Sequence, residues 1–178
     1  MPVTAEMIKQ LRELTNAGVM DCKKALEATD GDLTRAQAIL REKGLLMAAK
    51  KADRVARQGL VESYVHMGRI GALVELNCET DFVARMPEFK ELAHTLAMQI
   101  VGAQPQYLKP EDVPAPVLEE QKRLCGDDLD KFYGETCLLK QVSIQDQSRT
   151  VQDLINEAIG KTHENIVLRR FARFELGE

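Results

Sequence analysis

The stretch Leu60–Asn77, LVESYVHMGRIGALVELN, decides the fold of this chain. Its two halves, Leu60–His66 and Ile70–Asn77, have the composition of β-strands, and the connection at 67–69 contains a glycine. A short glycine-containing loop between two such runs is typical of a β-hairpin. The sequence therefore predicts an antiparallel pair of strands in the first half of the chain.

Two helices and a third strand follow the predicted hairpin. Apolar residues recur at helical spacing from Phe89 to Ile100. Thr150 followed by Asp153 is the pattern of a capping box and predicts the start of another helix. In Ile166–Leu176, the residues Ile166, Leu168, Ala172, Phe174 and Leu176 alternate and are predicted to share one face, with Arg170 as the exception.

The segment between the two helices is less regular. Four prolines between positions 105 and 116 predict a loop with one helical turn, and a polar helix is expected around Leu118–Leu124. Phe132–Ile144 leaves helix and strand both open, with Thr136–Leu139 as the candidate strand.

The first 45 residues predict three short helices. Thr4 is placed to cap the first, Ala17-Gly18 interrupts it, Asp32 caps the third and Gly44 closes it as the residue after the helix end. Isolated helices of this length are marginally stable, so we expect them to pack as a bundle.

A separate Ala-rich helix from Leu45 to Arg57 is predicted to link this bundle to the rest. The chain then divides into a three-helix domain at 1–45, a linker helix at 46–58 and an α+β domain at 59–178 with a small antiparallel sheet packed by helices. Basic residues on the linker helix also allow an RNA-binding arm, but no aromatic residues alternate with them for base stacking.

The composition excludes several classes of function. The net charge of −4 and the pI of 5.5 argue against nucleic acid as a partner. No run reaches the roughly 18 apolar residues of a membrane span, and Met1–Thr4 does not begin an apolar targeting segment, so we expect a cytoplasmic protein without membrane contact. The four cysteines form no C-x-x-C pair, which favours reduced thiols and no metal site.

The sequence contains no complete enzymatic motif. Gly160-Lys161-Thr162 resembles the end of a phosphate-binding loop, but that loop needs a glycine where Ile155 stands, and Gly160 is explained as the residue that ends a helix. The three histidines are far apart and lack a recognisable nucleophile. We therefore expect no catalytic residues, no cofactor and no direct nucleotide binding.

The segment Thr80-Asp81-Phe82-Val83 is the strongest candidate site, because it follows a strand and precedes a strong helix. In one interpretation Thr80 caps a helix, Asp81 favours the helix dipole, and Phe82 and Val83 pack inward. In the other, Thr80 fixes the corner while Asp81 and Phe82 project towards a partner.

Val19-Met20 leaves the same two alternatives open. The pair follows a glycine between the first two helices, where apolar side chains can cover the bundle core or contact a partner's helix. Methionine suits adaptable contact surfaces.

Several long motifs in the right order resemble bacterial elongation factor Ts, the guanine-nucleotide exchange factor of elongation factor Tu, in its short form. The resemblance covers nearly the whole chain. The matching stretches are Leu11–Leu26 (LRELTNAGVMDCKKAL), Glu75–Ala84 (ELNCETDFVA), Leu96–Ile100 (LAMQI), Lys109–Pro114 (KPEDVP) and Arg169–Gly177 (RRFARFELG).

The resemblance implies a function and a set of contact residues. The N-terminal helices would form a ubiquitin-associated-like domain whose Arg12, Val19 and Met20 meet the nucleotide-binding domain of Tu. Thr80, Asp81, Phe82 and Val83 would approach the magnesium and phosphate site of Tu–GDP, with Phe82 as a wedge and Asp81 disturbing the magnesium coordination. Gln99, on the core helix, would press on the partner's phosphate loop. GDP release and GTP reloading would follow, with Tu bound in both its GDP-bound and nucleotide-free forms.

The chain departs from the family pattern in four respects. Val19 stands where many members carry Met, and Gln99 where many carry His. The region Leu124–Lys131 looks shortened. Long members contain two related core halves and this chain has one, so we expect a homodimer through the sheet and the C-terminal strand. Two rival hypotheses remain: an interaction module without exchange activity, and an RNA-binding protein that uses Lys50–Arg57.

Overall fold

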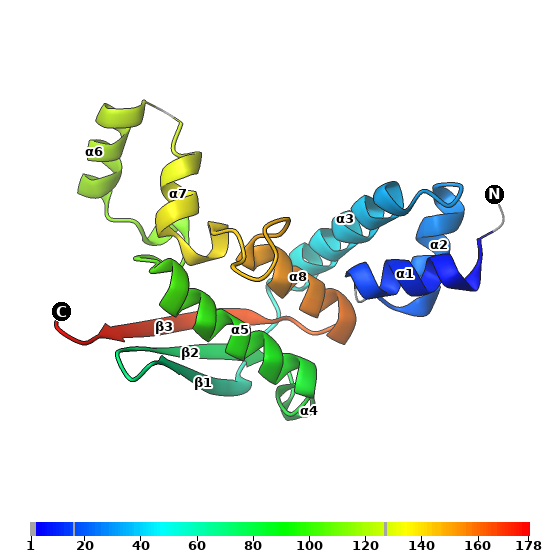
Figure 1. Cartoon of the computed structure of the whole chain (residues 1–178), viewed down its shortest axis with the longest axis horizontal. Helices are drawn as coiled ribbons and strands as arrows, with labels where there is room; N and C mark the ends of the chain where they lie inside the picture. Colours follow the sequence, from blue (N-terminus) through cyan, green and yellow to red (C-terminus); the bar gives the residue numbers. More distant parts are fainter. Residues whose placement is uncertain (1–2, 16, 127) are drawn as a thin grey trace.

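The computed structural model describes residues 3–15, 17–126 and 128–178. A bundle of helices at the N-terminus is followed by a core in which helices cover one face of a small sheet (Figure 1). The architecture is α+β, as predicted. No helix in the described ranges is long and apolar enough to cross a membrane.

The sheet has three strands in the order β1-β2-β3: β1 (Gln58–His66), β2 (Ile70–Cys78) and β3 (Val167–Glu175). Both pairings are antiparallel, and β1 pairs with β2 without interruption from Gln58↔Cys78 to His66↔Ile70. The predicted hairpin and third strand are confirmed.

The prediction that alternate residues of the last strand share one face is wrong. A β-bulge lies opposite Glu75/Leu76, so Leu76 pairs with Leu168 while Glu75 pairs with Arg170. An extra residue in one strand moves every following side chain to the other face. Leu168 therefore faces the core, whereas Phe174 is exposed on the opposite face of the sheet.

Two helices, α4 (Asp81–Ala84) and α5 (Pro87–Ala103), pack on the inner face of the sheet, and α8 (Val151–Thr162) packs against α5 and completes the same core. Pro87 occupies the first turn of α5, and Thr150 and Asp153 form the predicted capping box of α8. The core contains six large apolar side chains that are fully buried. They are Val74, Leu76, Leu96, Ile100, Leu138 and Val151.

The irregular region between α5 and α8 contains the short turn η1 (Pro110–Asp112), α6 (Ala115–Cys125), α7 (Asp130–Thr136) and the turn η2 (Leu138–Lys140). The candidate strand at Thr136–Leu139 is wrong, because α7 ends at Thr136, η2 begins at Leu138, and Cys137 between them forms only an isolated bridge. Two isolated bridges, Tyr107↔Cys137 and Val142↔Thr150, are the sheet-like pairing that the described residues show there.

The N-terminal bundle consists of α1 (Ala5–Thr15), α2 (Val19–Ala28) and α3 (Leu33–Lys51). The Thr4 hydroxyl accepts a hydrogen bond from the Met7 amide at 3.3 Å, and Asp32 accepts one from the Arg35 amide at 3.0 Å. Both predicted caps are thus in place. The three helices enclose a small core of their own, which contains Leu11, Cys22, Ala25, Leu26 and Ala36.

Two predicted helix ends are wrong. Helix α3 continues through Gly44 to Lys51, so the separate linker helix is its second half, and α8 continues through Gly160 to Thr162. Packing explains both glycines, because α3 crosses α8 there and close contact overrides their weak helix propensity. The domain boundaries at 45 and 58 stay a prediction, and α3 runs across the first of them.

Candidate functional site

The corner between β2 and α5 combines the two interpretations of Thr80–Val83. Thr80 caps α4, since its hydroxyl oxygen accepts a hydrogen bond from the Val83 amide at 3.4 Å. Val83 is 4% exposed and packs into the core, whereas Phe82 is 77% exposed. The corner therefore uses Thr80 and Val83 as anchors and presents Phe82 to solvent.

Asp81 lies beside Phe82 on the surface. Its carboxylate accepts a hydrogen bond from Arg85 at 2.8 Å, and both side chains are largely exposed. Exposed ion pairs of this kind contribute little stability, on the order of 0.2–1 kcal/mol. Asp81 can therefore exchange Arg85 for another partner at low cost.

Glu164 holds the corner from the far end of the sequence. Its carboxylate accepts hydrogen bonds from the backbone amides of Glu79 at 3.1 Å and Thr80 at 3.0 Å, and from the Thr80 hydroxyl at 2.6 Å. Sequence reasoning missed this residue, because no local spacing connects positions 84 residues apart.

Cys78 supports the same corner from inside the core. Its buried thiol lies 3.1 Å from the Thr80 carbonyl oxygen and donates to it. Burial, with a contribution from the negative charge of Glu164, raises the pKa of Cys78 from 9.0 to about 11. The thiol is therefore protonated at neutral pH and acts as a hydrogen-bond donor rather than as a nucleophile.

The N-terminal candidates are exposed. Val19 and Met20 form the first turn of α2 and are 48% and 62% exposed, so they do not cover the bundle core. Arg12 is also exposed, on α1. In Figure 1 the N-terminal bundle and α4 both lie towards the right of the core, whereas α6 and α7 lie towards the left.

Gln99 differs from the other candidates because it is only 1% exposed. Its amide donates to the Gln141 side chain and the Val142 carbonyl, both at 3.2 Å, and accepts from the Ile144 amide at 2.8 Å. The structure therefore places Gln99 inside the core, where it fixes a loop. That loop presents Val142 and Ile144, each about half exposed.

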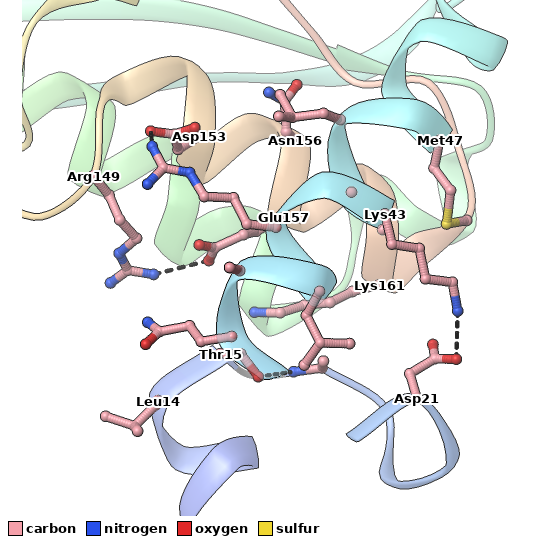
Figure 2. Close-up of a pocket in the computed structure, with 18 of the residues that line it drawn as sticks. Leu14, Thr15, Asp21, Lys43, Met47, Arg149, Asp153, Asn156, Glu157 and Lys161 are labelled. Atoms are coloured by element: carbon pink, nitrogen blue, oxygen red, sulfur yellow. Dashed lines mark hydrogen bonds and ion pairs between the residues drawn. The ribbon is translucent and has the colours of Figure 1, made fainter. Parts of the chain in front are cut away.

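A cavity of about 340 Å³ is lined by residues of the N-terminal helices and of α8, beside the place where α3 contacts α8 (Figure 2). Ion pairs join Arg41 to Asp153 and Arg149 to Glu157, the latter at 2.8 Å. Residues 79–83 do not line the cavity. The first pair fastens α3 to α8, which links the bundle to the core.

The remaining chemistry of the described residues is modest. They contain no group of three or more His, Cys, Asp or Glu side chains arranged to hold a metal ion. All four cysteines are free thiols, and Cys125 is the exposed one. The most distinctive feature is the exposed Phe82 and Asp81 on a rigid corner.

An exposed aromatic residue and an adjacent carboxylate, each held by a fixed corner, form a surface suited to binding another protein. The fold and this site define a protein-binding factor. Residues 3–128 match the profile of the family described as "Elongation factor TS". The chain belongs to the elongation factor Ts family, whose members are translation elongation factors.

Similar proteins match almost from end to end. Elongation factor Ts of a Thermoanaerobacter species is 51% identical over 195 positions, which cover 99% of this chain and 96% of that protein. That of Caldanaerobacter subterraneus is 52% identical, with 99% and 98% covered. That of Thermodesulfovibrio yellowstonii is 47% identical, with 100% and 98% covered.

These alignments run over 195 positions, whereas the chain has 178 residues. The relatives therefore contain residues that this chain lacks. The prediction that the shortening lies near Leu124–Lys131 stays a prediction, and Asp127 within it is outside the described residues.

Proposed function

We propose that the chain is a guanine-nucleotide exchange factor for elongation factor Tu and performs no covalent chemistry itself. It binds Tu–GDP, promotes release of GDP and leaves Tu ready to take up GTP. The observation that carries this proposal is the presentation of Phe82 and Asp81 at the surface by a corner whose other two residues are anchored. Membership of the elongation factor Ts family supports it.

Phe82 and Asp81 have separate roles in the proposed mechanism. Phe82 inserts between apolar side chains of Tu, and burying its ring supplies the free energy to hold Tu in an altered conformation. Asp81 places a negative charge near the magnesium site of Tu. Since a bound divalent cation is the largest positive charge facing the phosphates, disturbing its coordination weakens GDP binding.

The coupling between the two ligands of Tu is reciprocal. If the factor lowers the affinity of Tu for GDP by a given ratio, GDP lowers the affinity of Tu for the factor by the same ratio. The factor therefore acts through differential binding to nucleotide-free and nucleotide-bound Tu. It needs no nucleotide site of its own.

Two further contact regions belong to the proposal. Arg12, Val19 and Met20 bind the nucleotide-binding domain of Tu, and their exposure on the first two helices supports this. Gln99 acts indirectly, by fixing the loop that carries Val142 and Ile144, because its own amide is buried.

The chain is proposed to work as a cytoplasmic homodimer. The outer face of the sheet carries exposed apolar side chains from all three strands, and exposed apolar side chains on one face favour association. These residues are Val61, Val65, Leu73 and Phe174. Two chains then supply the two core halves found in long members of the family.

Release of a fluorescent GDP analogue from Tu tests the proposed function. The wild-type chain is expected to accelerate release, and Phe82→Ala and Asp81→Ala are each expected to reduce that acceleration at least tenfold, about 1.4 kcal/mol. Glu119→Ala is the matched control, since Glu119 is an exposed acid on α6. No acceleration by the wild-type chain would refute the exchange function, and unaltered rates for both variants would refute the site.

A further inference from the structure

The exposed Phe82 lies on a helix that is too short to be stable without contacts to the rest of the chain. Helix α4 has only four residues, and a single helical turn is far below the length at which an isolated helix is stable. The direction in which Phe82 points therefore depends on the packing of Val83 in the core and on the contacts that fix the start of α4. Those contacts converge on the carboxylate of Glu164.

Glu164 fixes the capping residue through both of its oxygens. One oxygen accepts from the backbone amides of Glu79 and Thr80, and the other accepts from the Thr80 hydroxyl at 2.6 Å. A threonine hydroxyl has one hydrogen to donate and two lone pairs to accept with. With its hydrogen directed at Glu164, the Thr80 oxygen keeps a lone pair for the Val83 amide, which closes the cap of α4.

A second carboxylate makes the reverse connection. Glu79 accepts a hydrogen bond from the Asn165 amide at 2.6 Å and lies 3.5 Å from the Arg54 guanidinium. The end of β2 and the turn after α8 thus each supply a carboxylate that binds a backbone amide of the other. Two such reciprocal bonds restrict rotation of the corner more than one alone.

The same turn also binds the end of α3. The side-chain amide of Asn165 donates to the carbonyls of Ala52 at 3.3 Å and Arg54 at 2.7 Å. The Lys51 ammonium group donates to the His163 carbonyl. The turn at 163–165 is therefore the common anchor of α3 and of the corner that carries Phe82.

We propose that Glu164 is a positioning residue for nucleotide exchange: it does not touch the partner, but acts through Thr80 to hold Phe82 in its binding orientation. This inference rests on the proposed function and adds a residue to the same site. The sequence separation of 84 residues between Glu164 and Thr80 means that the turn after α8 controls the contact surface after β2.

A double-mutant cycle in the GDP-release assay tests the proposal with the full chain and Tu. Glu164→Ala is expected to lower the saturating release rate roughly tenfold, about 1.4 kcal/mol. In the Phe82→Ala background it is expected to change the rate by less than about twofold, because residues that act through one another are not additive. Equal losses in both backgrounds would overturn the proposal, since Glu164 would then support the fold generally.

The substitution Glu164→Gln separates hydrogen bonding from charge. A glutamine side chain can accept from both backbone amides through its oxygen and donate to the Thr80 hydroxyl through its nitrogen. Glu164→Gln is therefore expected to retain exchange within about threefold of wild type, because the same three hydrogen bonds can form. A loss as large as that of Glu164→Ala would contradict positioning by hydrogen bonds.

Amide hydrogen exchange of the free chain tests the geometry without Tu. The amides of Glu79 and Thr80 are expected to exchange at least tenfold faster in Glu164→Ala, while the amide of Val74 in β2 is unchanged. Unchanged rates at both Glu79 and Thr80 would overturn the proposal. If the wild-type chain does not accelerate nucleotide release but these amides respond, then the proposed function fails while the anchoring role of Glu164 stands.

Discussion

Gly44 and Gly160 face each other where α3 crosses α8: a β-carbon on Gly160 would lie 3.9 Å from the Cα atom of Gly44. A β-carbon on Gly44 would lie 3.6 Å from the Asn156 carbonyl oxygen. Both distances are ordinary van der Waals contacts, so the two helices approach closely but leave room for a methyl group. The joint between the bundle and the core is therefore tight without being strained.

Alanine and leucine at these glycines are expected to have opposite effects. Gly44→Ala should raise the free energy of unfolding by about 0.5–1 kcal/mol, because glycine inside a helix costs that much relative to alanine. Gly160→Leu should lower it by about 1–3 kcal/mol, because the larger side chain pushes α3 away from α8. Urea denaturation measures both, and a loss of stability in Gly44→Ala would show that the gap is smaller than described.

Cys78 gives the fold a sensitivity to alkali. Its folded-state pKa of about 11 lies above its ordinary value of 9.0, so the folded chain retains a proton that the unfolded chain loses. The resulting stability is present below pH 9 and is lost as the pH rises towards 11, with about 1–1.5 kcal/mol lost by pH 10.

Unfolding measured at pH 7 and pH 10 tests this effect. The difference between the two pH values should shrink in Cys78→Ala and stay unchanged in Cys125→Ala, since Cys125 is exposed. Burial raises the pKa values of Cys22 and Cys137 as well, so part of the alkaline loss should persist. An undiminished difference in Cys78→Ala would contradict the assignment.

Asp153 is expected to give the opposite pH dependence. Burial alone would raise its pKa, but hydrogen bonds from the Thr150 amide and hydroxyl and the charge of Arg41 together lower it. A carboxylate with a lowered folded-state pKa contributes stability at neutral pH that is lost as the pH falls below its ordinary value of 3.8.

Asp153→Asn should reduce the free energy of unfolding by about 1–3 kcal/mol at pH 7, because it removes the charge of a helix cap and of the pair with Arg41. The loss should become smaller as the pH falls below about 4 in urea titrations. Asp53→Asn serves as the control at an exposed position. A loss that is constant across the acidic range would indicate that packing, and not charge, is responsible.

The hairpin turn offers a stabilising substitution. Met67 and Gly68 both have left-handed backbones, with φ values of 50° and 67°, and the Arg69 amide bonds to the His66 carbonyl at 3.0 Å. Such a turn favours Asn-Gly. Met67→Asn should therefore raise the free energy of unfolding by about 0.5–1 kcal/mol, which thermal unfolding detects as a higher melting temperature. Met67→Val should lower the melting temperature, because β-branched residues tolerate positive φ poorly.

Light scattering tests the proposed homodimer. The wild-type chain is expected to show twice the mass of one 20.0 kDa chain at micromolar concentration. Leu73→Asp, on the outer face of the central strand, should shift it to the monomer because the charge would be buried in the interface. Leu124→Asp, an exposed residue on α6, should leave the dimer intact. A wild-type monomer would rule the dimer out.

The elements with strong local signals were predictable from the sequence. The hairpin, the cap at Thr80, the capping box at Thr150 and the long helix after Pro87 all depend on residues within a few positions of one another. The failures arise where distant residues decide the structure. Gly44 was expected to end a helix, yet contact with α8, more than 100 residues later in the chain, keeps α3 continuous.

The site was predictable to the same extent. Its exposed residues, Asp81 and Phe82, lie in one short motif. The structure exposes both side chains, as the interpretation in which they project outward required. The residues that hold the motif in place, above all Glu164, come from a distant turn and carry no local pattern. The bulge opposite Glu75 was hidden for a different reason, because alternating apolar residues look the same on either side of it.

The unbroken helix α3 sets the orientation of the N-terminal bundle relative to the core. An α-helix turns by about 100° with each residue, and α3 joins the bundle that carries Met20 to the anchor of Phe82 without a break. Inserting or deleting a single residue in α3 would swing Met20 by more than a quarter turn around the helix axis while leaving every local motif intact. In the proposed complex with Tu, the length of α3 therefore fixes the angle between the two surfaces that bind the partner.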